Sequence, residues 1–136
     1  MAAFALVNPY VSLASNDLTN YVRAVTLDVT VDEADTTNAG SSSWKTMVGS
    51  LKGGSISLTF NQDVAASALD SIMWPLLGTS VAFEIRATTS AVGTSNPKWT
   101  GSCIVTGWQP VAGSVGDTAQ VSVSFPTTGT ITRATS

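Results

Sequence analysis

The acidic side chains of Asp32, Glu33 and Asp35 form the densest group of potentially reactive residues in the sequence. Carboxylates this close together can bind a hard cation. A calcium-binding loop, however, needs more oxygen ligands at a regular spacing, and the Thr and Asn residues that follow do not supply that spacing. We therefore interpret the cluster as the solvated end of a strand and predict no metal site.

Catalytic groups are scarce in this chain, which has no histidine and a single cysteine. Histidine is the commonest general base and metal ligand, so a histidine-based triad and a zinc site are both excluded. Paired carboxylates such as Asp28 and Glu84 could still meet on one sheet face, which leaves a hydrolase as a minor alternative. Cys103 lies in an alternating segment and is predicted to be a small buried thiol. We predict that the protein is not an enzyme and uses no cofactor.

The chain carries little charge for its length. It has 136 residues, of which 11% are charged, and a net charge of -3, whereas soluble domains usually contain about 25% charged residues. Its six Lys and Arg residues are scattered along the sequence, so we predict no cationic patch that would grip nucleic acid. We expect one domain, residues 1–136, with much of its surface covered by other protein.

The N-terminal segment is mildly apolar, but its first basic residue is Arg23. A secretory signal opens with a positively charged segment, which is missing here. No apolar run approaches the ~18 residues that span a bilayer. We expect neither export nor membrane insertion.

Alternation of apolar and polar residues predicts a mainly β protein. The alternating segments are residues 20–35, 55–60, 81–88, 98–108, 119–126 and 129–135. A period of two is typical of strands with one buried face, and the stretches rich in Gly, Ser, Pro and Asn between them suit hairpin turns. We predict an antiparallel β-sandwich or partial barrel of about six or seven strands with one flanking α-helix.

The flanking helix is predicted at residues 62–76. Its apolar residues recur at helical spacing and would form one stripe against the sheet. Asn61 or Asp63 can cap its start. Pro75 ends its regular part because a proline clashes with the preceding turn.

A long loop is predicted at residues 33–54, between the first two strands. Loops longer than roughly 12 to 15 residues are usually functional or disordered in compact domains. This one carries four large apolar side chains that a simple tether does not need: Trp44, Met47, Val48 and Leu51. Two interpretations stay open, since the loop could fold back over its own domain or dock on a neighbouring subunit.

Four tryptophans keep a carbohydrate-binding function open, because aromatic faces stack on sugar rings. Trp74 falls at the end of the predicted helix, and Trp99 and Trp108 fall in a predicted strand, where ordinary packing explains them. Trp44 lies outside any predicted element. The alternative to self-assembly is therefore a secreted or virion-surface carbohydrate-binding β-sandwich.

The elements follow one another in a recognisable order. A short N-terminal arm, residues 1–17, precedes the long strand, the long loop and a second strand. The helix "NQDVAASALDSIMWPLLG" and hairpins that end in "GDTAQVSVSFPTTGTITRAT" complete the chain. This order resembles that of the tail tube (major tail) proteins of long-tailed bacteriophages. The resemblance covers nearly the whole chain, and residues 107–135 are the most typical of that family.

The resemblance implies subunits that form hexameric rings, with sheets joined into a continuous inner barrel and rings stacked into a tube for DNA ejection. It implies that the arm at 1–17 and the loop at 33–54 contact neighbouring subunits. The other partners would be tape measure, tail terminator and tail tip or baseplate proteins. The protein would be made in the cytoplasm of a host bacterium and would reside in the virion tail.

Electrostatics predicts what should line such a tube. Cations that face inward would hold the passing DNA, whereas a neutral or acidic polar wall lets it pass without specific binding. The candidates for this wall are polar residues on alternating strands: Thr26, Asp28, Thr30, Glu84, Gln120, Ser122 and Ser124.

Overall fold

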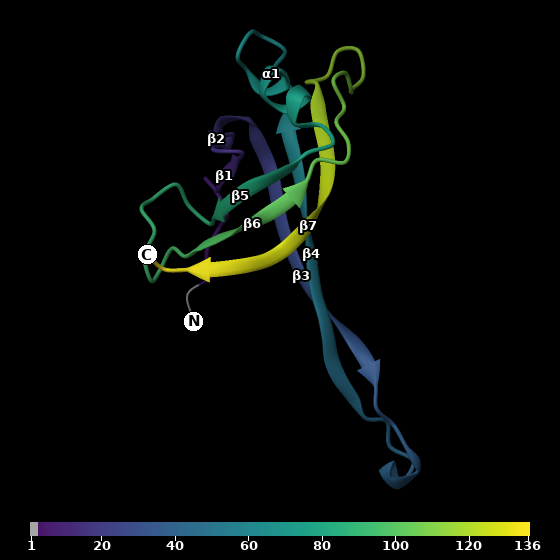
Figure 1. Cartoon of the computed structure of the whole chain (residues 1–136). Coiled ribbons are helices and arrows are strands. Elements are labelled where there is room, and N and C mark those ends of the chain that lie inside the picture. Colours follow the sequence, from purple (N-terminus) through teal and green to yellow (C-terminus); the bar gives the residue numbers. More distant parts are fainter. Residues whose placement is uncertain (1–2) are drawn as a thin grey trace.

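A computed structural model describes residues 3–136 and confirms the mainly β architecture with a single short helix (Figure 1). The strands are β1 (Tyr10–Leu13), β2 (Asn16–Asp17), β3 (Val22–Asp35), β4 (Met47–Asn61), β5 (Ser80–Arg86), β6 (Lys98–Ile104) and β7 (Gln120–Ala134). The helical elements are α1 (Leu69–Met73) and the short 3-10 turns η1 (Thr19–Tyr21), η2 (Ala39–Ser41) and η3 (Trp74–Leu76).

All pairings are antiparallel, in the order β2-β1-β5-β6-β7-β4-β3. Strand β7 joins the two halves, since residues 120–126 pair with β4 and residues 127–134 pair with β6. The bend comes at Pro126, which has no N–H to continue the ladder, and at Gly129, whose φ of +80° favours glycine. The sheet therefore folds over into a sandwich with two open edges, in which β5 and β6 cross β3 and β4 (Figure 1).

Strand β7 also corrects the sequence-based prediction at the C-terminus. Residues 129–135 were expected to form a separate short strand, but most of them continue β7 without interruption. A register shift between Thr100 and Ser102 of β6 absorbs the bend. The proline and glycine therefore redirect one strand and do not end it.

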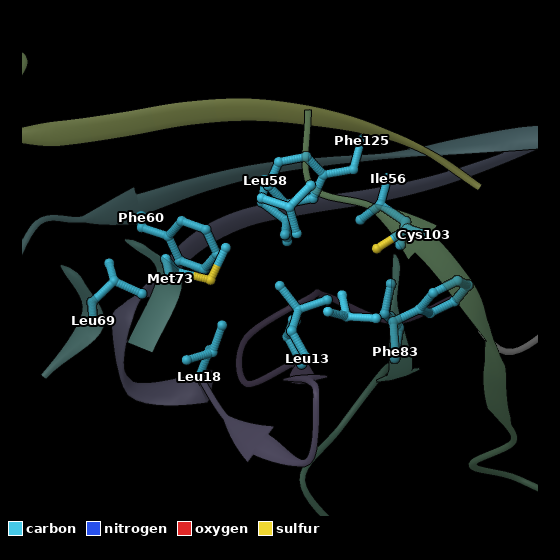
Figure 2. Packing of buried hydrophobic residues seen from close by; sticks show 14 of the residues in the cluster. Leu13, Leu18, Ile56, Leu58, Phe60, Leu69, Met73, Phe83, Cys103 and Phe125 are labelled. Carbon is cyan, nitrogen blue, oxygen red and sulfur yellow. The ribbon is translucent and has the colours of Figure 1, made fainter. Parts of the chain in front are cut away.

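The core lies between the two halves of the sheet (Figure 2). Ile56, Leu58 and Phe60 of β4 and Phe125 of β7 face Leu13, Phe83 and Cys103 from β1, β5 and β6, and all of these side chains are buried. Fully burying one large apolar side chain contributes about 1.5–3 kcal/mol. The alternation predicted for residues 55–60, 81–85 and 121–125 is confirmed, and it supplies most of the contacts that hold the halves together.

The N-terminal arm is shorter than predicted. Residues 10–17 of the expected arm at 1–17 form β1 and β2, and both Val11 and Leu13 are fully buried. Residues 3–9 remain outside the sheet, and residues 1 and 2 lie outside the described part of the chain. β1 is drawn into the sheet because its side chains fill the core opposite β4.

The helix is also shorter than the predicted 62–76, because α1 begins at Leu69 and continues only into η3. Asp63 accepts a hydrogen bond from the Ala65 N–H at 3.0 Å through its side chain, which forms a local turn in place of a helical cap. Ser67 then adopts a positive φ of 61°, which a helix does not allow. The apolar spacing of residues 64–68 therefore does not produce helix.

The predicted loop at 33–54 is mostly strand, which is the largest correction. β3 continues to Asp35 and β4 begins at Met47, so residues 36–46 alone turn the chain. Gly49, Gly53 and Gly54 weaken the sequence signal for a strand here, because glycine is depleted in strands. Its regularity comes from pairing along β3, and together the two strands form a ribbon that extends far beyond the sandwich (Figure 1).

Candidate assembly surfaces

The ribbon consists of the distal parts of β3 and β4, residues 28–35 and 47–54, together with the tip at 36–46. β7 follows β4 only as far as the pair Ser55–Pro126, so β4 residues 47–54 pair with β3 alone. At ~3.3 Å per residue, this unsupported part is roughly 26 Å long. A two-stranded ribbon exposed to water is only marginally stable. Its length therefore suggests a surface that other chains cover.

Gly54 marks the point where the ribbon leaves the body. A Cβ atom there would clash with the backbone carbonyl of Asp28 on the paired strand and would touch the Ile131 side chain. The Thr127 hydroxyl donates a hydrogen bond to the Gly54 carbonyl at 3.2 Å. Only glycine allows this close approach of β3, β4 and β7, so the position fixes the direction in which the ribbon departs.

The tip has a defined hydrogen-bonded structure within a single copy. Thr36 and Thr46 close it, with a backbone bond of 2.9 Å and a hydroxyl pair at 2.8 Å. Asn38 and Ser41 cap η2 reciprocally. The Asp35 carboxylate accepts hydrogen bonds from the Thr37 side chain and from the Thr37 backbone N–H, the latter at 2.8 Å. Both bonds favour the charged carboxylate and lower the pKa of Asp35 below its ordinary value of 3.8. The acid that the sequence placed in a solvated cluster thus has a structural role.

The four predicted contact residues, Trp44, Met47, Val48 and Leu51, all lie on the ribbon or its tip and are exposed. The Trp44 side chain is 78% exposed and that of Leu51 is 75% exposed. The interpretation in which this segment folds back over its own domain is therefore wrong.

Six of the seven lumen candidates lie on one polar surface of β3, β4 and β7. Thr26, Ser57 and Ser124 pair across the three strands in one row. The other members follow the same alternation along their strands: Asp28 and Thr30 on β3, and Gln120 and Ser122 on β7. All six candidates are exposed. Pairing with β4, whose outward side chains are Ser55, Ser57 and Thr59, makes this surface continuous.

Glu84 is the exception, because it lies on β5 in the other half of the sandwich. Its carboxylate is 3.0 Å from the Arg86 Nε atom, and the Arg86 guanidinium lies 3.9 Å from the centre of the Tyr10 ring. Arg86 also donates a hydrogen bond to the Ser90 carbonyl at 2.8 Å. Glu84 therefore holds an arginine in place and does not share the polar surface of β3, β4 and β7.

The tryptophans are dispersed over the molecule. Trp44 is in the tip, Trp74 in η3 and Trp99 in β6. Trp108 was predicted to lie in the same strand as Trp99, but β6 ends at Ile104 and Trp108 follows it. Trp108 packs against Phe60, with 6.0 Å between ring centres, and its indole N–H donates to the Asp70 carboxylate at 2.9 Å. Residues on four separate elements do not form a sugar-stacking platform.

The chemistry of the remaining groups is limited. Cys103 is buried as predicted, and burial raises the pKa of its thiol to about 11. Within residues 3–136, no three His, Cys, Asp or Glu side chains gather where they could hold a metal ion. No helix in that part of the chain is long and apolar enough to cross a membrane.

Comparison with solved structures finds the same fold in two virus-like assemblies. A chain in the virion of a native gene transfer agent particle superposes with a TM-score of 0.69 at 18% sequence identity, over 93% of this chain and 95% of that one. A chain in the tail of an empty gene transfer agent particle, refined with C6 symmetry, gives a TM-score of 0.64 at 18% identity, over 86% of this chain and 85% of that one. The chain shares its fold with a component of that tail. The predicted resemblance is thereby confirmed at the level of fold. No family model and no curated protein matches the sequence.

Proposed function

We propose that this protein is a structural component of a phage-type tail, in which six copies form a ring and stacked rings form a tube for DNA. The observation that carries the proposal is the ribbon, which exposes Trp44 in its tip and Met47, Val48 and Leu51 on β4, where β4 pairs with β3 alone. The C6 symmetry of the tail with the similar fold supports the ring of six.

Edges of the sheet support self-assembly. β3 forms one end of the strand order, so the backbone groups along its outer side have no partner strand within residues 3–136. Long free edges attract other strands, and closing a ring is one way to remove them. Contacts between different surfaces of identical subunits close into rings or continue as filaments. A stacked tube uses both kinds of contact.

The polar surface of β3, β4 and β7 is our candidate for the tube lining. Its hydroxyl and amide side chains present no cation, and Asp28 adds a negative charge. Such a wall would let DNA slide because it forms no ion pairs with phosphate. Glu84 is not part of this proposal, since its position and its ion pair with Arg86 give it a structural role.

In this proposal the protein resides in the virion tail after synthesis in the cytoplasm of a bacterial host. Its partners would be copies of itself, the tape measure protein inside the tube, and terminator and tip or baseplate proteins at the ends. The DNA would pass without specific binding. No catalytic step is proposed for any residue.

Electron microscopy of the purified protein over a concentration series tests the proposal. We expect rings or tubes with six subunits per turn, and their appearance should depend on concentration. A folded protein that stays monomeric at millimolar concentration, and that is absent from tails of particles produced with it, would refute the proposed function.

A further inference from the structure

Residues 105–110 run beside β7 without forming a strand with it. The Thr106 hydroxyl donates a hydrogen bond to the Ser124 carbonyl at 3.5 Å. Three residues later, the Gln109 side-chain oxygen accepts a hydrogen bond from the Ser122 N–H at 3.4 Å. The residue numbers rise along this segment while those of its β7 partners fall, so the segment is antiparallel to β7. Side chains therefore bridge a gap that backbone hydrogen bonds would span in a regular ladder.

The segment also keeps the register of β6 on β7. The ladder between these strands ends at the pair Cys103–Thr127, and counting onward from that pair brings Thr106 opposite Ser124. Pro126 interrupts the ladder between the two points because it has no N–H to donate. Apolar and polar residues alternate in the sequence as far as residue 108, as they do in a strand. The segment thus has the position and direction of a strand but lacks its backbone hydrogen bonds.

The segment has free hydrogen-bonding groups and room to move. A cavity of about 290 Å³ is lined by its residues 106–109 and by residues 122–124 of β7. The backbone N–H groups of Thr106 and Gly107 have no hydrogen-bond acceptor within residues 3–136. A Cβ atom added to Gly107 would meet no other atom within 4 Å. Nothing in the described part of the chain therefore prevents the segment from closing on β7.

Trp108 can stay in the core while the segment closes. Its ring packs against Phe60, and its indole N–H donates to the Asp70 carboxylate. Between the two bridging hydrogen bonds the segment advances by three residues and β7 by two, and a β-bulge absorbs one extra residue of this kind. With the bulge at Trp108, the exposed side chains of Thr106 and Gln109 both lie on the polar side of the sheet.

Strand direction identifies the partner of such a strand. β3 and β7 are both antiparallel to β4 and therefore parallel to each other. In a ring of the proposed kind all copies point the same way, so a direct junction between β7 and β3 of the next copy would be parallel. With residues 105–110 between them, every pair is antiparallel, which is slightly more stable per residue. The outer edge of β3, 14 residues long, has no partner strand within residues 3–136.

We infer that residues 105–110 become a fourth strand of the polar surface when copies associate, closing on β7 and pairing along their other side with the free edge of β3 of the next copy. The inference rests on the proposed function. It goes beyond the joining of sheets that the family resemblance implies, because it identifies the joining segment and a change of structure within the subunit. It also adds Thr106 and Gln109, which are uncharged, to the candidates for the tube lining.

Hydrogen exchange, measured residue by residue, tests the change of structure. In the unassembled subunit the amides of Thr106 and Gly107 should exchange rapidly, because they lack an acceptor. In tubes they should exchange at least ~100-fold more slowly, because both sides of the new strand are paired. If β3 of the next copy instead displaced the segment and paired with β7 directly, the amides of Thr106 and Gly107 would stay rapid in tubes. That result would overturn the inference.

Gly107→Pro removes a donor of the new strand without removing a hydrogen bond of the subunit. The variant should melt like the wild type by circular dichroism. It should raise the protein concentration needed for assembly about 10-fold or more, because proline cannot continue a ladder. Gly107→Ala is the matched control, since it keeps the N–H and its Cβ meets no other atom; it should assemble within about threefold of the wild type. A folded proline variant that assembles like the alanine control would overturn the inference.

Disulfide formation between copies tests the partner. Subunits with Thr106→Cys are mixed with subunits that carry one cysteine on the polar side of β3: Ala24→Cys, Thr26→Cys or Asp28→Cys. At least one mixture should give a mixed disulfide under conditions where tubes form. Thr100→Cys, in the other half of the sandwich, replaces Thr106→Cys in the control and should give none. Cys103 does not interfere because it is buried and its thiol pKa is raised to about 11.

The outcomes separate the inference from the proposed function. Tubes without protection of the Thr106 and Gly107 amides, or without any mixed disulfide, would overturn the inference and leave the proposed function standing. Failure of the wild type to form rings or tubes would refute the proposed function, and this inference with it.

Discussion

Replacing Trp44 with alanine should separate folding from assembly. The Trp44 side chain is 78% exposed in a single copy, and the backbone N–H of Trp44 donates a hydrogen bond to the Ser41 carbonyl at 3.1 Å, which alanine preserves. Exposed substitutions of this kind usually change the free energy of unfolding by no more than about 0.5 kcal/mol. The isolated subunit should therefore melt almost like the wild type.

The effect on assembly should be much larger. A tryptophan side chain presents at most about 250 Å², so 78% exposure leaves roughly 195 Å² to be covered by a neighbour. At about 25 cal/mol per Å², complete coverage would contribute at most ~5 kcal/mol. Measured hot spots more often fall near 2–4 kcal/mol. Even a loss of about 2 kcal/mol would raise the concentration required for assembly roughly 30-fold.

Sedimentation of tubes over a concentration series measures that threshold, and thermal unfolding of the unassembled subunit measures stability. Trp74→Ala is the matched control, since it removes the same side chain from η3, at the end of the molecule opposite the tip (Figure 1). We expect Trp74→Ala to shift the threshold by less than about threefold. An unchanged threshold for Trp44→Ala, or equal losses in both variants, would contradict the assignment of the ribbon as a contact surface.

Three further predictions concern the subunit itself. Cys103 should react with a thiol reagent at pH 8 at least ~100-fold more slowly in the folded protein than in denaturant, because the thiol is buried and its pKa is raised to about 11. Rapid labelling of the folded protein would contradict this burial. The pKa of Asp35 is lowered in the folded protein, so the carboxylate stabilises the tip above pH 3.8, its ordinary pKa, and this contribution is lost as the pH falls through the lower folded pKa. Hydrogen exchange at the Thr37 amide, which donates to Asp35, should therefore accelerate at that lower pH. Exchange that follows only the intrinsic pH trend would count against this role of Asp35. Trp108→Phe removes the indole N–H that donates to the Asp70 carboxylate. Urea titration should show that the free energy of unfolding falls by about 1–3 kcal/mol. A change below about 0.5 kcal/mol would show that the hydrogen bond between Trp108 and Asp70 is unimportant for stability.

Regular alternation is what made the body of the fold predictable from sequence. Residues 55–60 and 81–85 alternate apolar and polar side chains, and both are strands with a buried face. The ribbon escaped prediction because residues 47–54 have weak strand propensity and gain their structure from β3. The helix was overestimated because the Asp63 turn and the positive φ of Ser67 override apolar spacing.

The candidate surfaces were predictable to different degrees. Trp44 and Leu51 could be identified because large apolar residues in a Gly- and Ser-rich segment have no local partner. The separation of Glu84 from the other lumen candidates could not, because it depends on the strand order, which places β5 in the other half of the sandwich. A single sequence does not specify that order.

The free edge of β3 also has a consequence for the isolated subunit. Newly made subunits that meet edge to edge could pair at random and form amyloid-like aggregates. Asp32, Glu33 and Asp35 stand at the outer end of that edge, where two ribbons approaching side by side would bring like charges together. Like charges at this position disfavour indiscriminate edge-to-edge pairing, which is how gatekeeper residues protect exposed strands.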